Sequence, residues 1–159
     1  MGRTGVQVGH IGGLLERPRR GEPIPEGKFL PTRFTLEGEW KEDGWPNFHG
    51  QWLWALGEHL RLGGERELPE VFAGPVRTVL AYLERFWDEP CYDAWEEHPT
   101  RLHTSTLASI YGGLRAMAAF FPSAAKTAQE VRRVVLEECL EDGRFVKFVG
   151  NPAVDASLL

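Results

Sequence analysis

The sequence predicts an all-α fold of four to five helices for most of this 159-residue chain. From residue 45 onward, apolar residues recur every three or four positions, the spacing of one helix face. Glycines and prolines, which end helices, separate these segments. Hydrophobic residues make up 42% of the chain and charged residues 26%, as in globular domains that bury a core.

Residues 1–44 form a separate, irregular segment. They hold half of the eighteen glycines and four of the eleven prolines, so long regular elements are not expected there. Only "KFLPTRFTLEGEW" has β-type side chains for one or two short strands. The chain therefore divides into an irregular part, 1–44, and a helical part, 45–159.

Two helices are expected between residues 48 and 90. The first, "FHGQWLWALGEHLRLGG", ends at a glycine pair, and the second, "GPVRTVLAYLERFWDEP", has Pro75 in its first turn and stops at Pro90. Their apolar stripes are Trp52, Leu53, Leu56 and Leu60 in the first, and Val76, Val79, Leu80, Leu83 and Trp87 in the second.

Two further helices follow. The segment "HTSTLASIYGGLRAMAAFFP" is capped by Thr104 or Ser105, and "SAAKTAQEVRRVVLEECLEDG" is capped by Ser123 and stopped by Gly143. Their stripes are Leu107, Ile110, Tyr111, Leu114, Ala118 and Phe121, then Ala128, Val131, Val135 and Cys139.

The last residues predict a hairpin arm and the start of a fifth helix. "RFVKFVG" is apolar enough for a β-like arm, and "NPAVDASLL" opens a helix with Asn151 as cap and Pro152 at the first position. Because the chain ends where this apolar stripe begins, we expect a truncated protein.

Charge and cysteine content exclude several classes of function. The net charge of −5 and the scattered basic residues argue against nucleic acid as a partner. No apolar run is long enough for a bilayer, and the N-terminus lacks a secretion signal, so a cytoplasmic location is expected. Cys91 and Cys139 are expected to be buried thiols, and the spacing of Cys91, His98 and His103 matches no zinc pattern. No metal and no cofactor are expected.

The acidic stretch "CYDAWEEHPTRLHTSTLASI" carries the chemistry. A carboxyl group beside an aromatic ring and a second carboxylate has a raised pKa, so it can protonate a leaving oxygen. Trp95, Glu96, Glu97 and Asp93 supply these parts. Acidic residues also suit the positive start of a helix, and spacing alone favours that structural interpretation. The six tryptophans are open to the same two interpretations, as core residues or as sugar-stacking surfaces.

Three motifs follow one another along the chain: "GWPNFHGQWLWALGEHL", "YDAWEEHPTRLHTSTLASIYGGLRA" and "FVKFVGNPAVDASLL". This ordered set resembles the glucoamylase-type glycoside hydrolases, family 15, and "PTRFTLEGEW" is similar to the loop that precedes the first motif in that family. The likeness runs from about residue 31 to the C-terminus.

The resemblance implies an (α/α)6 toroid, of which this chain is a part, and cleavage of α-glucosidic bonds with inversion. It implies that Glu96 is the general acid and that the substrate-binding residues are Trp45, Asp93, Trp95 and Glu97. The expected substrates are α-glucosides of the maltose, dextrin or trehalose class.

The sequence departs from the family pattern in three places. The family's general base lies beyond the Asp-Ala-Ser-Leu-Leu segment, where nothing in this chain matches it. Its upstream Arg-Asp pair is not found, and His49 and Gly50 stand where an Asp-Gly pair is usual.

We therefore expect the isolated chain to be inactive. Two alternatives stay open: a non-catalytic carbohydrate-binding fragment, and a small helical protein that binds partner helices through residues 104–121. A cut toroid would expose apolar surface, so we expect self-association, a companion chain, or cover by residues 1–44.

Overall fold

The computed structural model describes residues 46–95 and 97–158. The predicted irregular segment 1–44, Trp45 and Glu96 lie outside the described residues, so the predictions on them are not tested. The described helices are α2 (Pro46–Gly63), α3 (Glu70–Phe86), α4 (Thr104–Met117) and α5 (Pro122–Glu138). The strands β1 (Leu140–Glu141) and β2 (Arg144–Phe145) and the 3-10 helix η1 (Ala156–Leu158) follow. The all-α prediction is confirmed, and four helices with one small sheet are consistent with part of a toroid.

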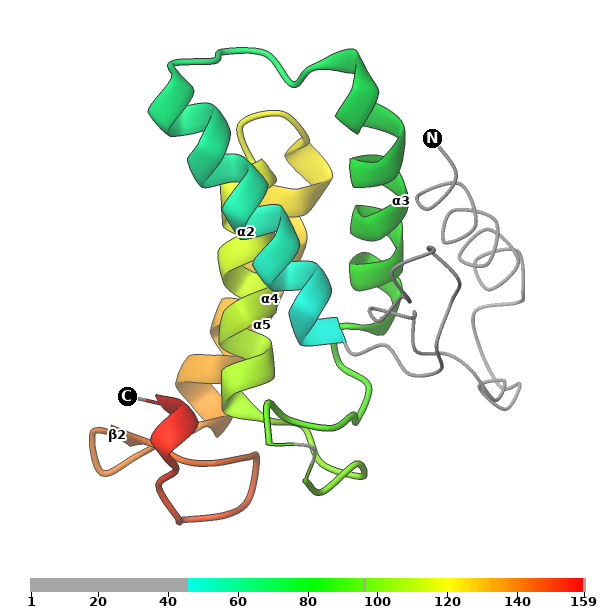
Figure 1. Ribbon diagram of the computed structural model, residues 1–159. Helices are drawn as coiled ribbons and strands as arrows, with labels where there is room; N and C mark the ends of the chain where they lie inside the picture. Colours follow the sequence, from blue (N-terminus) through cyan, green and yellow to red (C-terminus); the bar gives the residue numbers. More distant parts are fainter. Residues whose placement is uncertain (1–45, 96, 159) are drawn as a thin grey trace.

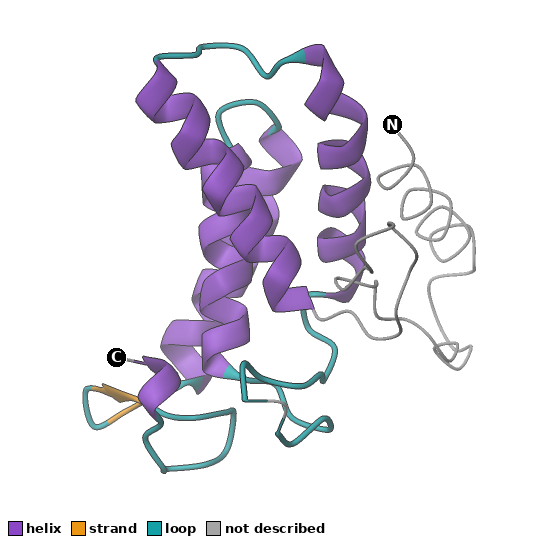
Figure 2. Cartoon of the chain, viewed as in Figure 1, coloured by secondary structure: helices purple, strands orange, loops and turns teal. Residues whose placement is uncertain are grey.

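Helix α4 lies at the centre of the bundle, where it packs against both α2 and α5 (Figure 1). The loop that follows α3 and the C-terminal segment lie at the same end of the bundle (Figure 2). None of the described helices combines the length and the apolar character needed to cross a membrane.

Glycines allow α2 and α4 to approach closely. A Cβ atom added at Gly50 would lie 2.4 Å from the Ser109 carbonyl oxygen, and one at Gly113 would lie 2.3 Å from the Gly50 oxygen. Both contacts are with backbone, which cannot turn aside as a flexible side chain can. The Gly50–Gly113 crossing therefore fixes how these two helices meet.

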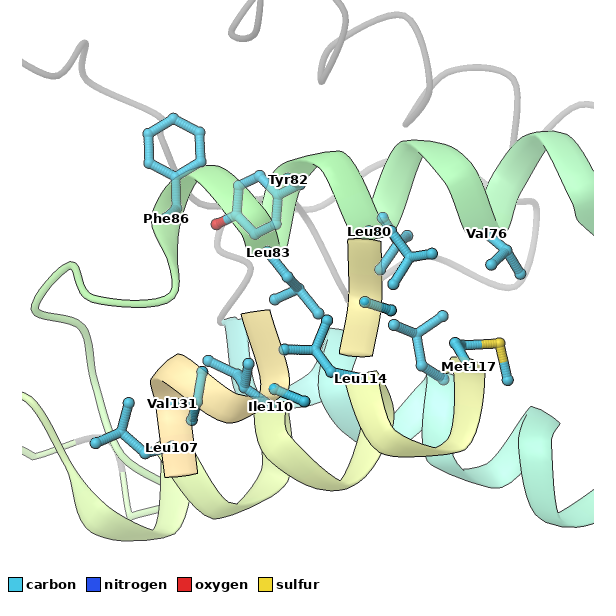
Figure 3. Close-up of a cluster of buried hydrophobic side chains, with 14 of the residues drawn as sticks. Val76, Leu80, Tyr82, Leu83, Phe86, Leu107, Ile110, Leu114, Met117 and Val131 are labelled. Carbon is cyan, nitrogen blue, oxygen red and sulfur yellow. The ribbon is translucent and has the colours of Figure 1, made fainter. Parts of the chain in front are cut away.

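The hydrophobic core fills the space between α3 and the other helices. Val76, Leu80 and Leu83 on α3 face Leu114 and Met117 on α4 (Figure 3). These five side chains are 3% exposed or less. Most of the predicted stripes are therefore confirmed as core, but Trp52 is 39% exposed and points out of it.

The start of α3 differs from the prediction. It begins at Glu70, so Pro75 lies inside it and not in its first turn. Leu68 and Phe72 pack against the core, which favours helix before the proline. Trp87, assigned to the stripe, is the residue that follows the last turn.

The predicted caps of α4 and α5 are also wrong. His103 precedes α4, and the Thr104 hydroxyl donates to the Val146 carbonyl instead of capping the helix. Pro122 opens α5, because proline suits a first helical position whose N–H would have no partner. Ser123 therefore lies within the first turn.

The C-terminal residues form a hairpin and a short turn, not an ordinary helix start. Asp142 and Gly143 take positive φ values of 49° and 75° between β1 and β2, so the predicted hairpin arm is confirmed. The Asn151 side chain accepts a hydrogen bond from the Ala153 N–H in a local turn. The Ala153 carbonyl in turn accepts from the Lys147 N–H at 2.7 Å, which delays the helical turn to Ala156.

Candidate functional site

Asp93 organises the loop between α3 and α4. Its Oδ1 accepts hydrogen bonds from the backbone N–H groups of Trp95 and Glu97, both at 2.9 Å. The Asp93 N–H also donates to the Glu97 carbonyl at 3.4 Å. Because Asp93 is only 1% exposed, the geometry favours a part in holding the loop closed. Direct substrate contact by Asp93 stays a prediction.

Trp95 and Glu97 project from this loop toward solvent. The Trp95 residue is 56% exposed and the Glu97 side chain 52%. The Trp95 Nε1–H donates to Asp155 Oδ1 at 2.9 Å. The same Asp155 oxygen accepts from the Ser157 N–H at 2.8 Å, which starts η1. The indole ring is thus fixed at one edge while its remaining surface stays accessible.

Lys147 connects three carboxylates. Its Nζ lies 2.6 Å from Glu97 Oε2, 3.1 Å from Asp155 Oδ2 and 3.8 Å from Asp93 Oδ2. Hydrogen bonds to Glu97 and then to Asp155 raise the pKa of Lys147 above its usual range. The pKa of Asp155 is lowered, first by the Ser157 backbone and side chain, then by Trp95 and Lys147. Both groups are therefore charged across the physiological range.

Backbone pairing brings Lys147 to the loop. His103 and Phe148 form an antiparallel bridge, and the Val149 N–H donates to the Leu102 carbonyl at 3.1 Å. On the other side, the Thr104 N–H donates to the Lys147 carbonyl at 3.1 Å. The start of α4 and the segment after β2 therefore lie side by side, although over forty positions separate them in the sequence.

His103 forms the buried floor of the site. It is fully buried, its Nε2 lies 3.0 Å from the His98 carbonyl, and its Nδ1 lies 3.7 Å from Asp93 Oδ2. Within the described part of the chain, no three His, Cys, Asp or Glu residues form a group that could hold a metal. Cys91 and Cys139 are buried, as expected, and burial raises the pKa of the Cys139 thiol.

The structure brings together three of the five predicted site residues, Asp93, Trp95 and Glu97. Glu96 and Trp45 lie outside the described residues. Sequence reasoning missed Lys147 and Asp155 as site residues. The sequence held a signal for Lys147, because a lysine within the apolar run "RFVKFVG" needs a partner if it is buried. The structure shows that its side chain is only 13% exposed.

The raised carboxyl pKa expected for Glu96 stays a prediction, because Glu96 lies outside the described residues. Of the neighbours expected to act on it, Trp95 is more than half exposed. The Glu97 carboxylate lies 2.6 Å from the Lys147 ammonium, which offsets its charge.

A separate groove runs along α2 and α4. It encloses about 510 Å³ beside Trp54, Gly57, Arg61, Arg115 and Phe120, and a smaller hollow next to it shares Trp54 and Gly112. Trp54 is 53% exposed. These lining residues come from α2, α4 and, for Phe120, the turn after α4, and none comes from the 93–97 loop. The groove and the loop are therefore distinct surfaces.

No protein-family model matches the chain. It is 40% identical over 163 aligned positions to an isomaltose glucohydrolase of Kribbella flavida, an alignment that covers 94% of this chain and 42% of that relative. A solved wild-type glycosidase is 37% identical with a TM-score of 0.85, and covers 98% of this chain with 45% of its own. A glycosidase variant in complex with glucose gives the same values.

The chain thus spans less than half the length of the relatives that it matches. The similarity is therefore one of sequence as well as of fold. In sequence and in structure, the chain is similar to part of each of these glycosidases.

Proposed function

We propose that this chain carries the proton-donor side of a glycoside hydrolase site that acts on α-glucosides. The observation that carries the proposal is the 93–97 loop, closed by a buried aspartate and presenting an indole and a carboxylate to solvent. The isomaltose glucohydrolase and the glucose-bound glycosidase that resemble the chain support an α-glucoside as substrate. Membership of family 15 is part of the proposal, and the cytoplasmic location stays a prediction.

Each loop residue has a chemical part in the proposal. Trp95 offers a flat apolar face on which a glucose ring stacks. Glu97 accepts hydrogen bonds from sugar hydroxyls, and Asp93 holds the loop backbone. Glu96, whose side chain lies outside the described residues, is the proposed general acid, which gives its proton to the glycosidic oxygen as the bond to C1 breaks.

Inversion needs a second carboxylate that activates water from the opposite face of the sugar, about 6.5–9.5 Å from the acid. The sequence offers no match to the family's base, so we propose that the isolated chain hydrolyses glucosides poorly or not at all. A companion chain that completes a toroid would supply the missing group, whereas a second copy of this chain would only cover its apolar surface. Half-exposed apolar side chains such as Trp54 and Val154 support such cover.

A titration with isomaltose tests the proposed binding surface. We expect Trp95→Ala to weaken isomaltose binding about tenfold, the scale of one lost aromatic contact. Isothermal titration calorimetry of the full chain measures the dissociation constant. Trp54→Ala is the matched control, because Trp54 is 53% exposed, close to the 56% of Trp95, but lies in the α2–α4 groove.

Equal losses in both variants, or no saturable binding by the unmodified chain, would contradict the proposal. Binding without any bond cleavage, even when a nucleophile is supplied, would instead indicate the non-catalytic carbohydrate-binding fragment. The helix-binding alternative has less support, because the Leu107, Ile110 and Leu114 side chains of α4 are already covered within this chain.

A further inference from the structure

Both exposed loop residues are tied to one charged pair. Trp95 is bonded to Asp155 through Nε1, and Glu97 to Lys147 through Oε2. Lys147 and Asp155 are themselves 3.1 Å apart. The residues on either side of position 96 are therefore attached to the same ion pair, which lies about fifty to sixty positions further along the chain.

The ion pair is fixed by its own backbone contacts. The Lys147 N–H donates to the Ala153 carbonyl at 2.7 Å, and the Lys147 carbonyl accepts from the Thr104 N–H at the start of α4. The Lys147 and Asp155 side chains are only 13% and 15% exposed. Anchors held in this way lose little conformational freedom when they bind the loop, so they stabilise its position effectively.

Lys147 also balances the local charge. Asp93, Glu97 and Asp155 bring three carboxylates within 4 Å of one ammonium group. A lysine ammonium group has three N–H donors, and the three carboxylates lie around it. Without Lys147 the three carboxylates would lose the ammonium group that offsets their mutual repulsion, and Glu97 and Asp155 would move apart.

We propose that Lys147 is a positioning residue for sugar binding: through Asp155 and Glu97 it holds both Trp95 and Glu97 in place. It acts on the sugar only through these two residues. The effect on sugar binding rests on the proposed function. The tie, by which we mean the contacts of Lys147 and Asp155 with Glu97 and Trp95, is a property of the chain alone.

Replacement of Lys147 by methionine tests the tie and its consequence separately. The methionine keeps an unbranched apolar stem and removes the charge. We expect the Trp95 and Glu97 backbone N–H groups to exchange with solvent about tenfold faster, the effect of losing one charge-assisted hydrogen bond. Glucose binding should weaken by a similar factor. Exchange is followed by NMR on the full chain, and glucose affinity by calorimetry.

Two variants serve as controls. Lys126→Met makes the same replacement at an exposed position of α5 and should change neither quantity. Lys147→Arg keeps the positive charge and should restore most of the exchange protection and of the glucose affinity, which a loss of general packing would not predict. Should Lys147→Met fail to fold, Glu97→Gln at an exposed side chain breaks one tie and should also speed exchange of the loop.

Unchanged exchange in Lys147→Met, or in Glu97→Gln if the former is unfolded, would overturn the tie. Faster exchange with unchanged glucose affinity would overturn the positioning role. Absence of glucose binding in the unmodified chain would refute the proposed function and, with it, the effect of Lys147 on sugar binding. The exchange measurement would still show whether Lys147 holds the loop.

Discussion

At the scale of single residues, burial decides the chemistry of His49. The side chain lies in α2, is 6% exposed, and packs edge-on against Tyr82 with ring centroids 5.4 Å apart. Burial lowers the pKa of His49 to about 4 from an ordinary 6.5. The folded state therefore holds this imidazole neutral, whereas the unfolded state takes up a proton as the pH falls below 6.5.

This difference predicts acid sensitivity. The contribution of a neutral His49 is fully present above pH 6.5 and is lost progressively as the pH falls toward 4. Between pH 7 and pH 5 we expect the free energy of unfolding to fall by about 2 kcal/mol from this residue. His49→Phe keeps a ring against Tyr82 and should flatten that dependence, as measured by urea unfolding at the two pH values.

His59→Phe is the matched control, because His59 lies on the same helix at an exposed position. It should keep the pH dependence of the unmodified chain. An unaltered pH dependence in His49→Phe would show that another group titrates.

At the scale of elements, the glycine crossing between α2 and α4 sets the geometry of the bundle. Gly112 and Gly113 are adjacent on α4 but differ in surroundings. The nearest atom to an added Cβ is 3.8 Å away at Gly112, which is an ordinary contact with Trp54, but 2.3 Å away at Gly113.

Alanine at these two positions should act in opposite directions. Gly113→Ala should destabilise the fold by about 1–3 kcal/mol, since the Gly50 backbone must move. Gly112→Ala should stabilise it by up to about 1 kcal/mol through helix propensity. Urea unfolding at pH 7 measures both, and equal effects would contradict the close crossing.

The existence of these helices could be predicted from the sequence, and so could the end of α2 at its glycine pair, but the caps of α4 and α5 could not. Apolar spacing reflects the core that each helix faces. It therefore predicted the helices even though Trp52, one residue of the first stripe, is exposed. Other ends depend on distant partners. The Thr104 hydroxyl donates to the Val146 carbonyl, and the Ala153 carbonyl accepts from the Lys147 N–H. These contacts override the local capping preferences of single residues.

The site could be predicted in part for the same reason. Asp93, Trp95 and Glu97 are neighbours in the sequence, so a motif contains them together. Lys147 and Asp155 reach the loop only because the segment after β2 pairs with the start of α4. That pairing also changes the electrostatics, since the charge of Glu97 is balanced by a lysine that no local pattern indicates.

At the scale of the whole molecule, we propose that this chain forms one part of a larger active site. Its match to a solved glycosidase covers 98% of this chain but only 45% of that glycosidase. The loop that carries Trp95 and Glu97 is open to solvent in the described part of the chain. Proton donation at position 96 is therefore the half of the reaction that we assign to this chain, and water activation is the other half.

Azide separates the two halves most directly, because it is a nucleophile that needs no general base. It would attack C1 of isomaltose from the face opposite the leaving group, while the departing oxygen takes the Glu96 proton; the products are β-glucosyl azide and glucose. We predict azide-dependent product from isomaltose with the unmodified chain and a loss of at least about 100-fold with Glu96→Gln. With α-glucosyl fluoride, whose leaving group needs no proton, both proteins should react alike; equal isomaltose cleavage by both proteins, or none by the unmodified chain, would contradict the assignment.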